Sequence, residues 1–146
     1  MSKTITIGEV IAYVDNIKPN TRTSDEKRLW LNDIDTMIKE DIIDTHEGGE
    51  SVDFIGYTED SSDDTELLVP AHYGRDMYSF YLMMKIDTIN NETAKYNNNA
   101  SMFQSVYNGF LVHYNQTHKP LQKHSIINEF STVTEVNCYA NPLSSN

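Results

Sequence analysis

Apolar residues recur at intervals of three and four along most of this chain, the spacing that places side chains on one side of an α-helix. Two of these stretches begin with a capping box, Thr6-x-x-Glu9 and Thr23-x-x-Glu26. In such a box the Thr and Glu side chains satisfy free backbone N–H groups of the first helical turn. The pattern predicts a mainly α, bundle-like domain. The expected helices cover about residues 7–17, 24–43 and 73–96, and a fourth ends near residue 118.

The helix expected over residues 73–96 carries apolar side chains on two nearly opposite faces. A helix that packs on one neighbour needs only one apolar stripe, so two faces imply that it is sandwiched, either inside the domain or between subunits. The first face, which we expect to meet Phe103, Tyr107 and Phe110 of the fourth helix, contains Tyr73, Met77, Phe80, Tyr81 and Met84. The second contains Tyr78, Leu82 and Ile89, which we assign to a subunit or partner interface.

The segment between the second and third helices lacks helical spacing. Gly48-Gly49 opposes a helix, and β-prone runs at 52–57 and 66–69 flank a polar stretch. This arrangement favours a small β-hairpin insertion over about residues 50–69, with a solvated tip. Three asparagines at 97–99 predict the turn between the third and fourth helices.

Negative charge is concentrated in one part of the chain. Residues 40–66 contain eleven Asp and Glu and no Lys or Arg, which matches the whole net charge of −11. Burying these carboxylates together would cost several kcal/mol per ion, so we expect them on open surface or against water in a channel. The candidate channel or surface residues are Asp60, Asp63, Asp64 and Glu66. The chain has no cluster of Lys and Arg of the kind that grips nucleic acid phosphates.

The side-chain constellations of known catalytic and metal sites do not occur in this sequence. His46-Glu47 lacks the second His of a zinc helix, and the glycines that follow oppose a helix. Asp60 and Asp64 have calcium-loop spacing without the Gly and Glu that an EF-hand requires, which leaves at most a loosely held surface cation. Cys138 is the single cysteine and is far in sequence from any His. We therefore expect no enzymatic activity, metal or cofactor.

The sequence divides into one helical domain over residues 1–120 and an extended C-terminal arm over residues 121–146. The arm has short, discontinuous apolar pieces after Pro120, a composition typical of segments that become ordered on a partner. Its candidate contact residues are Ile126, Ile127 and Phe130. No apolar run is long enough to cross a membrane, so we expect no membrane partner.

An ordered series of residues within 7–120 matches one known family. The series comprises Thr-Glu-Leu-Leu-Val-Pro at 65–70, Trp30, Leu31, His46, Glu47, Phe54, Tyr57, Tyr73, Tyr78, Tyr81, Leu82, Ile86, Asp87, Asn90, Glu92, Tyr96, Asn97, Phe103, Tyr114, Asn115, Thr117 and His118. With it, the chain resembles the head–tail connector, or adaptor, proteins of tailed bacteriophages and prophages. Ala71-His72 and Gln116 depart from the family's pattern, and the residues after Pro120 have no counterpart in it.

The resemblance implies a virion structural protein of the phage neck, made in the host cytoplasm. Copies would form a ring, expected to be a dodecamer, that joins the portal protein to downstream neck or tail proteins and lets DNA pass without specific binding. One alternative is a free-standing acidic interaction protein of the regulatory or DNA-mimic type, which would be a monomer or dimer. A weaker alternative is a metal-dependent enzyme, which metal content after purification would reveal.

Overall fold

The computed structural model describes residues 3–121, and this part of the chain is mainly helical, as predicted. It contains four α-helices, two short 3₁₀-helices and no β-strand. The elements are α1 (Ile7–Ile17), α2 (Ser24–Asp41), η1 (Ile43–Thr45), η2 (Gly49–Ser51), α3 (Ala71–Asn90) and α4 (Thr93–Thr117).

Both predicted capping boxes form, and they fix where α1 and α2 begin. The Glu9 backbone N–H donates to Thr6 Oγ1 at 3.3 Å, and the Thr6 N–H donates to Glu9 Oε2 at 3.2 Å. Thr23 and Glu26 make the same reciprocal pair at the start of α2. Each box satisfies two N–H groups that the first helical turn leaves without partners. The predicted bounds of α1 are therefore confirmed.

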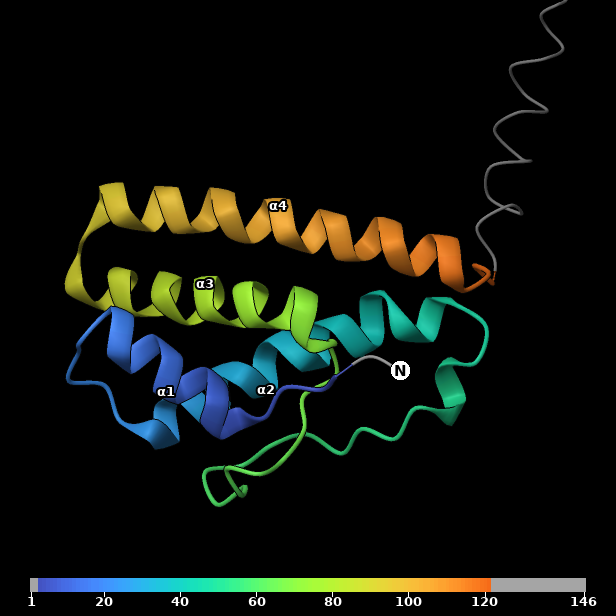
Figure 1. Ribbon diagram of the computed structural model, residues 1–146, viewed down its shortest axis with the longest axis horizontal. Coiled ribbons are helices and arrows are strands. Elements are labelled where there is room, and N and C mark those ends of the chain that lie inside the picture. The colour runs from blue at the N-terminus through green and yellow to red at the C-terminus, as the bar shows by residue number, and fades with distance from the viewer. Residues whose placement is uncertain (1–2, 122–146) are drawn as a thin grey trace, which may run out of the picture.

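The helices are arranged in three layers, with α3 in the middle (Figure 1). Helices α1 and α2 pack on one side of α3, and α4 packs on the other. The sandwiched position of α3 is thus confirmed, and it lies inside the domain. Fully buried side chains from three helices meet in the core: Val10, Val14, Leu31, Ile34, Ile38, Met77, Tyr78, Leu82 and Ile86.

The turn between α3 and α4 comes earlier than predicted. Helix α3 ends at Asn90, and Asn91 adopts a left-handed conformation with φ of 59°. Asparagine tolerates this conformation better than other non-glycine residues, which suits it to end a helix. The Glu92 N–H then donates to the Asp87 carbonyl at 2.9 Å. The asparagines at 97–99 lie inside α4, so the predicted turn there is wrong.

The predicted β-hairpin insertion is also wrong. Its second run pairs with the N-terminal segment instead of the first run, because the Leu67 N–H donates to the Ile5 carbonyl at 2.9 Å and the Ile7 N–H donates to the Thr65 carbonyl at 3.0 Å. These bonds give an isolated antiparallel bridge between Thr6 and Glu66, not a strand. The partner of this run lies about sixty residues away in sequence, a contact that local β-propensity cannot reveal.

Helix α4 is held to α3 largely by aromatic side chains. The ring centroids of Tyr73 and Phe110 are 5.7 Å apart, and those of Tyr81 and Phe103 are 5.5 Å apart. Both distances are typical of favourable aromatic pairs. Phe103 and Phe110 are the buried residues of α4, and the rest of the helix is partly or fully exposed. The predicted contact between these two phenylalanines and the first face of α3 is confirmed.

Replacing Gly109 by Ala should raise the free energy of unfolding by about 1 kcal/mol, because glycine in a helix interior costs about that much relative to alanine. Gly109 is exposed in the middle of α4, and an added Cβ would approach only Tyr73 Cε1, at an ordinary 3.8 Å. A urea titration of both forms measures the difference. A destabilised variant would show that Gly109 serves the packing of the domain.

Candidate functional site

A buried carboxylate holds the segment between η2 and α3 against the core. Asp35 of α2 is fully buried and accepts hydrogen bonds from Tyr57 Oη at 2.6 Å, Tyr78 Oη at 2.5 Å and the Leu68 N–H at 3.1 Å. The Tyr78 hydroxyl in turn accepts from the Val69 N–H at 3.0 Å. Asp35 thus joins α2, α3 and both ends of the acidic loop, which we define as residues 58–66.

Burial dominates the protonation behaviour of this cluster. Desolvation raises the pKa of Asp35 from 3.8 to about 6, although the hydrogen bonds from Tyr57, Tyr78 and Leu68 act in the opposite direction. Desolvation and the nearby Asp35 charge also raise the pKa of Tyr57 and of Tyr78 well above the usual value. Both phenols therefore remain donors to Asp35 at neutral pH. The cluster fixes the loop, and its three side chains are buried away from solvent.

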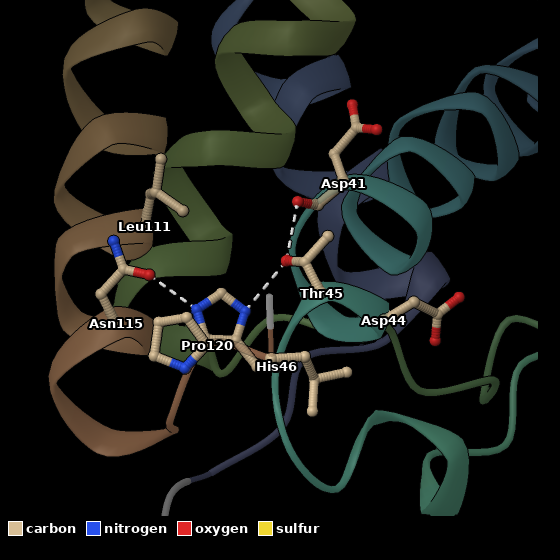
Figure 2. Close-up of a pocket in the computed structure, with 8 residues that line it drawn as sticks. Asp41, Asp44, Thr45, His46, Leu111, Asn115 and Pro120 are labelled. Atoms are coloured by element: carbon tan, nitrogen blue, oxygen red, sulfur yellow. Dashed lines mark hydrogen bonds between the residues drawn. The ribbon is translucent and has the colours of Figure 1, made fainter. Parts of the chain in front are cut away.

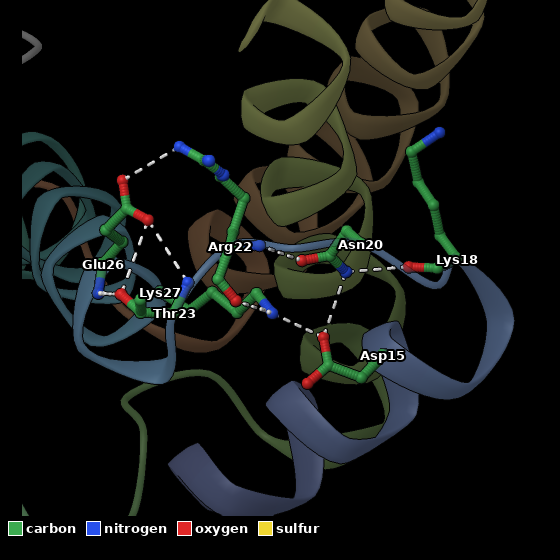
Figure 3. A network of polar contacts seen from close by, with 7 residues as sticks. All are labelled: Asp15, Lys18, Asn20, Arg22, Thr23, Glu26 and Lys27. Carbon is green, nitrogen blue, oxygen red and sulfur yellow. Dashed lines mark hydrogen bonds and ion pairs between the residues drawn. The ribbon is translucent and has the colours of Figure 1, made fainter. Parts of the chain in front are cut away.

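A second polar network fixes the connection between α1 and α2 (Figure 3). The buried Lys27 ammonium lies 2.5 Å from Asp15 Oδ1 and donates to the Arg22 carbonyl at 3.0 Å. The Asn20 side-chain amide donates to the same Asp15 oxygen at 3.1 Å and to the Lys18 carbonyl at 2.8 Å. The partners come from the end of α1, the start of α2 and the segment between them, so the network holds the two helices together.

A third ion-pair cluster lies at the turn between α3 and α4. Lys18 Nζ is 2.7 Å from Oδ1 of the fully buried Asp87, and Asn99 Nδ2 donates to Asp87 Oδ2 at 2.7 Å. Asp87 raises the pKa of Lys18, while Lys95 and Lys18 lower the pKa of Glu92 to about 2. The cluster ties the end of α1 to the turn between α3 and α4.

A pocket of about 460 Å³ lies where η1 meets the end of α4 (Figure 2). His46 is buried in it, with Nδ1 2.6 Å from the Ile42 carbonyl and Nε2 2.6 Å from Asn115 Oδ1. Both ring nitrogens are therefore engaged by the chain itself. Next to this ring, the Glu47 N–H donates to the Lys119 carbonyl at 2.8 Å. His46 accordingly anchors the end of α4 to η1, and it is not free to act as a base or metal ligand.

The part of the chain that the structure describes contains no cluster of metal-ligating side chains. No group of three or more His, Cys, Asp or Glu side chains in residues 3–121 is placed to hold a metal ion. The carboxylates Asp41 and Asp44 border the pocket, but Asp44 forms an ion pair with Lys39. The pocket therefore has a structural histidine and an acidic rim.

All eleven carboxylates of residues 40–66 are exposed, as expected. Among them, Asp63 lies 2.6 Å from Arg28, and this contact holds the acidic loop beside α2. The predicted residues Asp60, Asp63, Asp64 and Glu66 all lie on this loop. In Figure 1 the loop forms one edge of the molecule and α4 forms the opposite edge. These residues are exposed in this chain, and whether they face open surface or a channel stays a prediction.

The predicted subunit interface needs correction. Tyr78 and Leu82 are fully buried within the chain, where α1 and α2 cover the second face of α3, so they cannot contact another subunit. Ile89, at the end of α3, has 44% of its surface exposed and stays available. The remaining predicted contact residues, Ile126, Ile127 and Phe130, lie outside the described residues, as does the proposed arm after Leu121.

The structure brings out a surface that helical periodicity missed, the outer side of α4. We define the outer face of α4 by the exposed residues Asn98, Ser101, Met102, Ser105, Asn108 and Val112. It lies largely opposite Phe103 and Phe110, the two α4 side chains whose rings pack against Tyr81 and Tyr73 of α3. The sequence already distinguishes this helix, since no Asp, Glu, Lys or Arg lies between Lys95 and Lys119. Apolar spacing alone does not reveal this absence of charge.

No protein-family model, curated protein or solved structure matches the chain. In residues 3–121, none of the helices combines the length and apolar character needed to span a membrane. The candidate functional surfaces are therefore defined by geometry: the acidic loop along one edge of the domain and the outer face of α4 along the other.

Proposed function

We propose that this chain is a structural protein of a tailed-bacteriophage neck, where copies form a ring that joins the portal to downstream neck or tail proteins. The observation that carries the proposal is the separation of two different surfaces on one helical domain. A helix without charged side chains from residue 96 to 118 lies along one edge, and the acidic loop lies along the opposite edge. A ring subunit needs such a division between a surface for protein contacts and a surface that faces water.

The acidic loop suits a ring through which DNA passes. Its carboxylates are exposed, so they repel phosphates that come within a Debye length, about 8 Å at physiological salt. Arg28, which contacts the loop through Asp63, is also paired with Asp25. A lumen lined in this way lets DNA slide without specific binding. The likeness of residues 7–120 to head–tail connector proteins is the second support for the proposal, including its dodecameric ring.

Purified particles of the phage that encodes this chain should contain it, in a copy number close to that of the portal protein. The reason is that a neck ring stays in the finished virion, whereas a regulatory protein does not. Quantitative mass spectrometry of the particles measures both proteins. Portal and tail proteins detected without any trace of this chain would refute the proposal.

One alternative has an observation in its favour. Eleven exposed carboxylates on one domain also fit a free-standing acidic protein that binds a basic host protein in place of DNA. Such a protein would be absent from particles. It would be a monomer or dimer and would co-purify with a basic host protein from lysates of infected cells. The same particle analysis therefore separates the two functions.

A further inference from the structure

Helix α4 differs from the rest of the chain in its charge. The sequence contains 33 charged residues, 22 acidic and 11 basic, yet none of them falls between Lys95 and Lys119. An exposed helix face usually carries charged side chains, which form ion pairs along the helix and keep the surface hydrated. Most of α4 is exposed, so this face meets water through uncharged side chains alone.

The exposed residues of this face form a continuous line along the helix. Asn98, Ser101, Ser105, Asn108 and Val112 follow one another at alternating intervals of three and four. This spacing keeps a stripe on one side of a helix over several turns. Met102 and Val112 expose 44% and 54% of their surfaces beside and within it. The line is therefore long enough, and its side chains short enough, for another protein surface to approach closely.

Gly109 lies at the margin of this face, on the side of Tyr73. Its backbone does not adopt a positive φ, and a Cβ there would make only an ordinary contact with Tyr73. The packing of the domain therefore does not require glycine, although glycine weakens the middle of a helix. A close contact from outside the chain would account for it.

We infer that the outer face of α4 is the surface through which one copy of this chain contacts a second copy. The choice of a second copy rests on the proposed function, because a ring is built from copies of one chain. Charge supports the same choice. Each copy carries a net charge of −11, and contact through the acidic surfaces would place like charges together.

The chemistry of the face also fits a copy of the same protein. On the α4 side the contact requires no ion to lose its water, and that loss is the largest cost of burying a polar surface. Asn and Ser side chains both donate and accept hydrogen bonds, so they can pair with the uncharged polar groups of a neighbour. The exposed Met102 and Val112 add apolar area to the contact.

The test is the assembly of the full chain with lysine placed in the middle of this face. The double variant Ser105→Lys and Asn108→Lys should associate about tenfold more weakly or worse, because each ammonium would be buried without a partner. The substitutions make the net charge less negative, so weaker association cannot come from added repulsion between copies. Native mass spectrometry and sedimentation velocity over a range of concentrations measure the association.

A control for the placement of lysine on an exposed helix is Asn16→Lys on α1, compared with Asn108→Lys alone as well as with the double variant. It should associate like the unmodified chain, and circular dichroism should show the same helix content in all forms. The inference is overturned if the unmodified chain stays monomeric at every concentration, or if the α4 variant and the control behave alike. These results leave the particle composition untouched, so failure of the inference is distinguishable from failure of the proposed function.

Discussion

Raising the pH from about 3 to about 7 should remove about 3 kcal/mol of stability through Asp35 alone. The folded-state pKa of Asp35 is about 6, against 3.8 for the free side chain. At ~1.4 kcal/mol for each unit of pKa, this difference amounts to about 3 kcal/mol. The folded state binds the proton more tightly, so the stabilisation is fully present below pH 3.8 and is lost as the pH rises through 6.

The contribution of Asp35 is isolated by comparing variants, because other groups titrate in the same range. The lowered pKa of Glu92, for example, acts in the opposite direction. Urea titrations at several pH values measure the free energy of unfolding. The loss of about 3 kcal/mol between about pH 3 and pH 7 should appear in the unmodified chain and not in Asp35→Asn. Asp33→Asn controls for the loss of one negative charge, because Asp33 lies on the exposed side of the same helix. Parallel pH profiles for the unmodified chain and Asp35→Asn would mean that the carboxyl is not buried as the structure has it.

The parts of the fold that were predicted correctly depend on interactions between residues close in sequence. Thr6 and Thr23 each meet a glutamate three residues later, so both helix starts are encoded within four residues. The two apolar faces of α3 indicated its central place, because side-chain spacing alone decides how many neighbours a helix needs. The sequence could not say whether the second neighbour was another subunit, and it is in fact α1 and α2.

The errors depend on contacts between distant residues. Helix α3 ends at Asn90, and Lys18, which follows α1, contacts Asp87 and Glu92 on either side of the turn. From the sequence alone, Asn91 does not predict a turn more strongly than the asparagines at 97–99 do. Similarly, residues 66–69 have the composition of a strand, but the N-terminal segment supplies their backbone partner at Ile5. Both outcomes are decided by packing, which overrides local propensity.

The sequence contains one indication of the buried network around Asp35, which a search for apolar spacing alone does not detect. Asp35 falls between Ile34 and Ile38 on the buried face of α2, where a carboxylate is costly unless hydrogen bonds compensate it. A polar residue in such a stripe predicts buried partners. It cannot identify Tyr57 and Tyr78, which lie 22 and 43 residues further along the chain.

Replacing Phe110 by Ala should lower the free energy of unfolding by about 3–5 kcal/mol, the usual cost of removing a buried aromatic side chain. Phe110 is 3% exposed and packs between Tyr73 and Tyr114, with ring centroids 5.7 and 5.8 Å away. It is one of only two buried residues of α4 in the described chain, so its loss weakens the attachment of the whole helix. Domains of this size are stable by about 5–15 kcal/mol, so the variant approaches the limit of folding.

The structure also says where the damage from Phe110→Ala should appear. Helix α4 covers one side of α3 only, whereas α1 and α2 cover the other, so α4 should loosen before the rest of the domain opens. Hydrogen exchange should therefore accelerate most over residues 93–117 and least over α1 and α2. Val112→Ala on the exposed side of α4 is the matched control and should change stability by less than about 1 kcal/mol. Equal effects of the two substitutions would place the aromatic stripe on the surface and would reverse the orientation of α4, and with it the choice of its outer face for assembly.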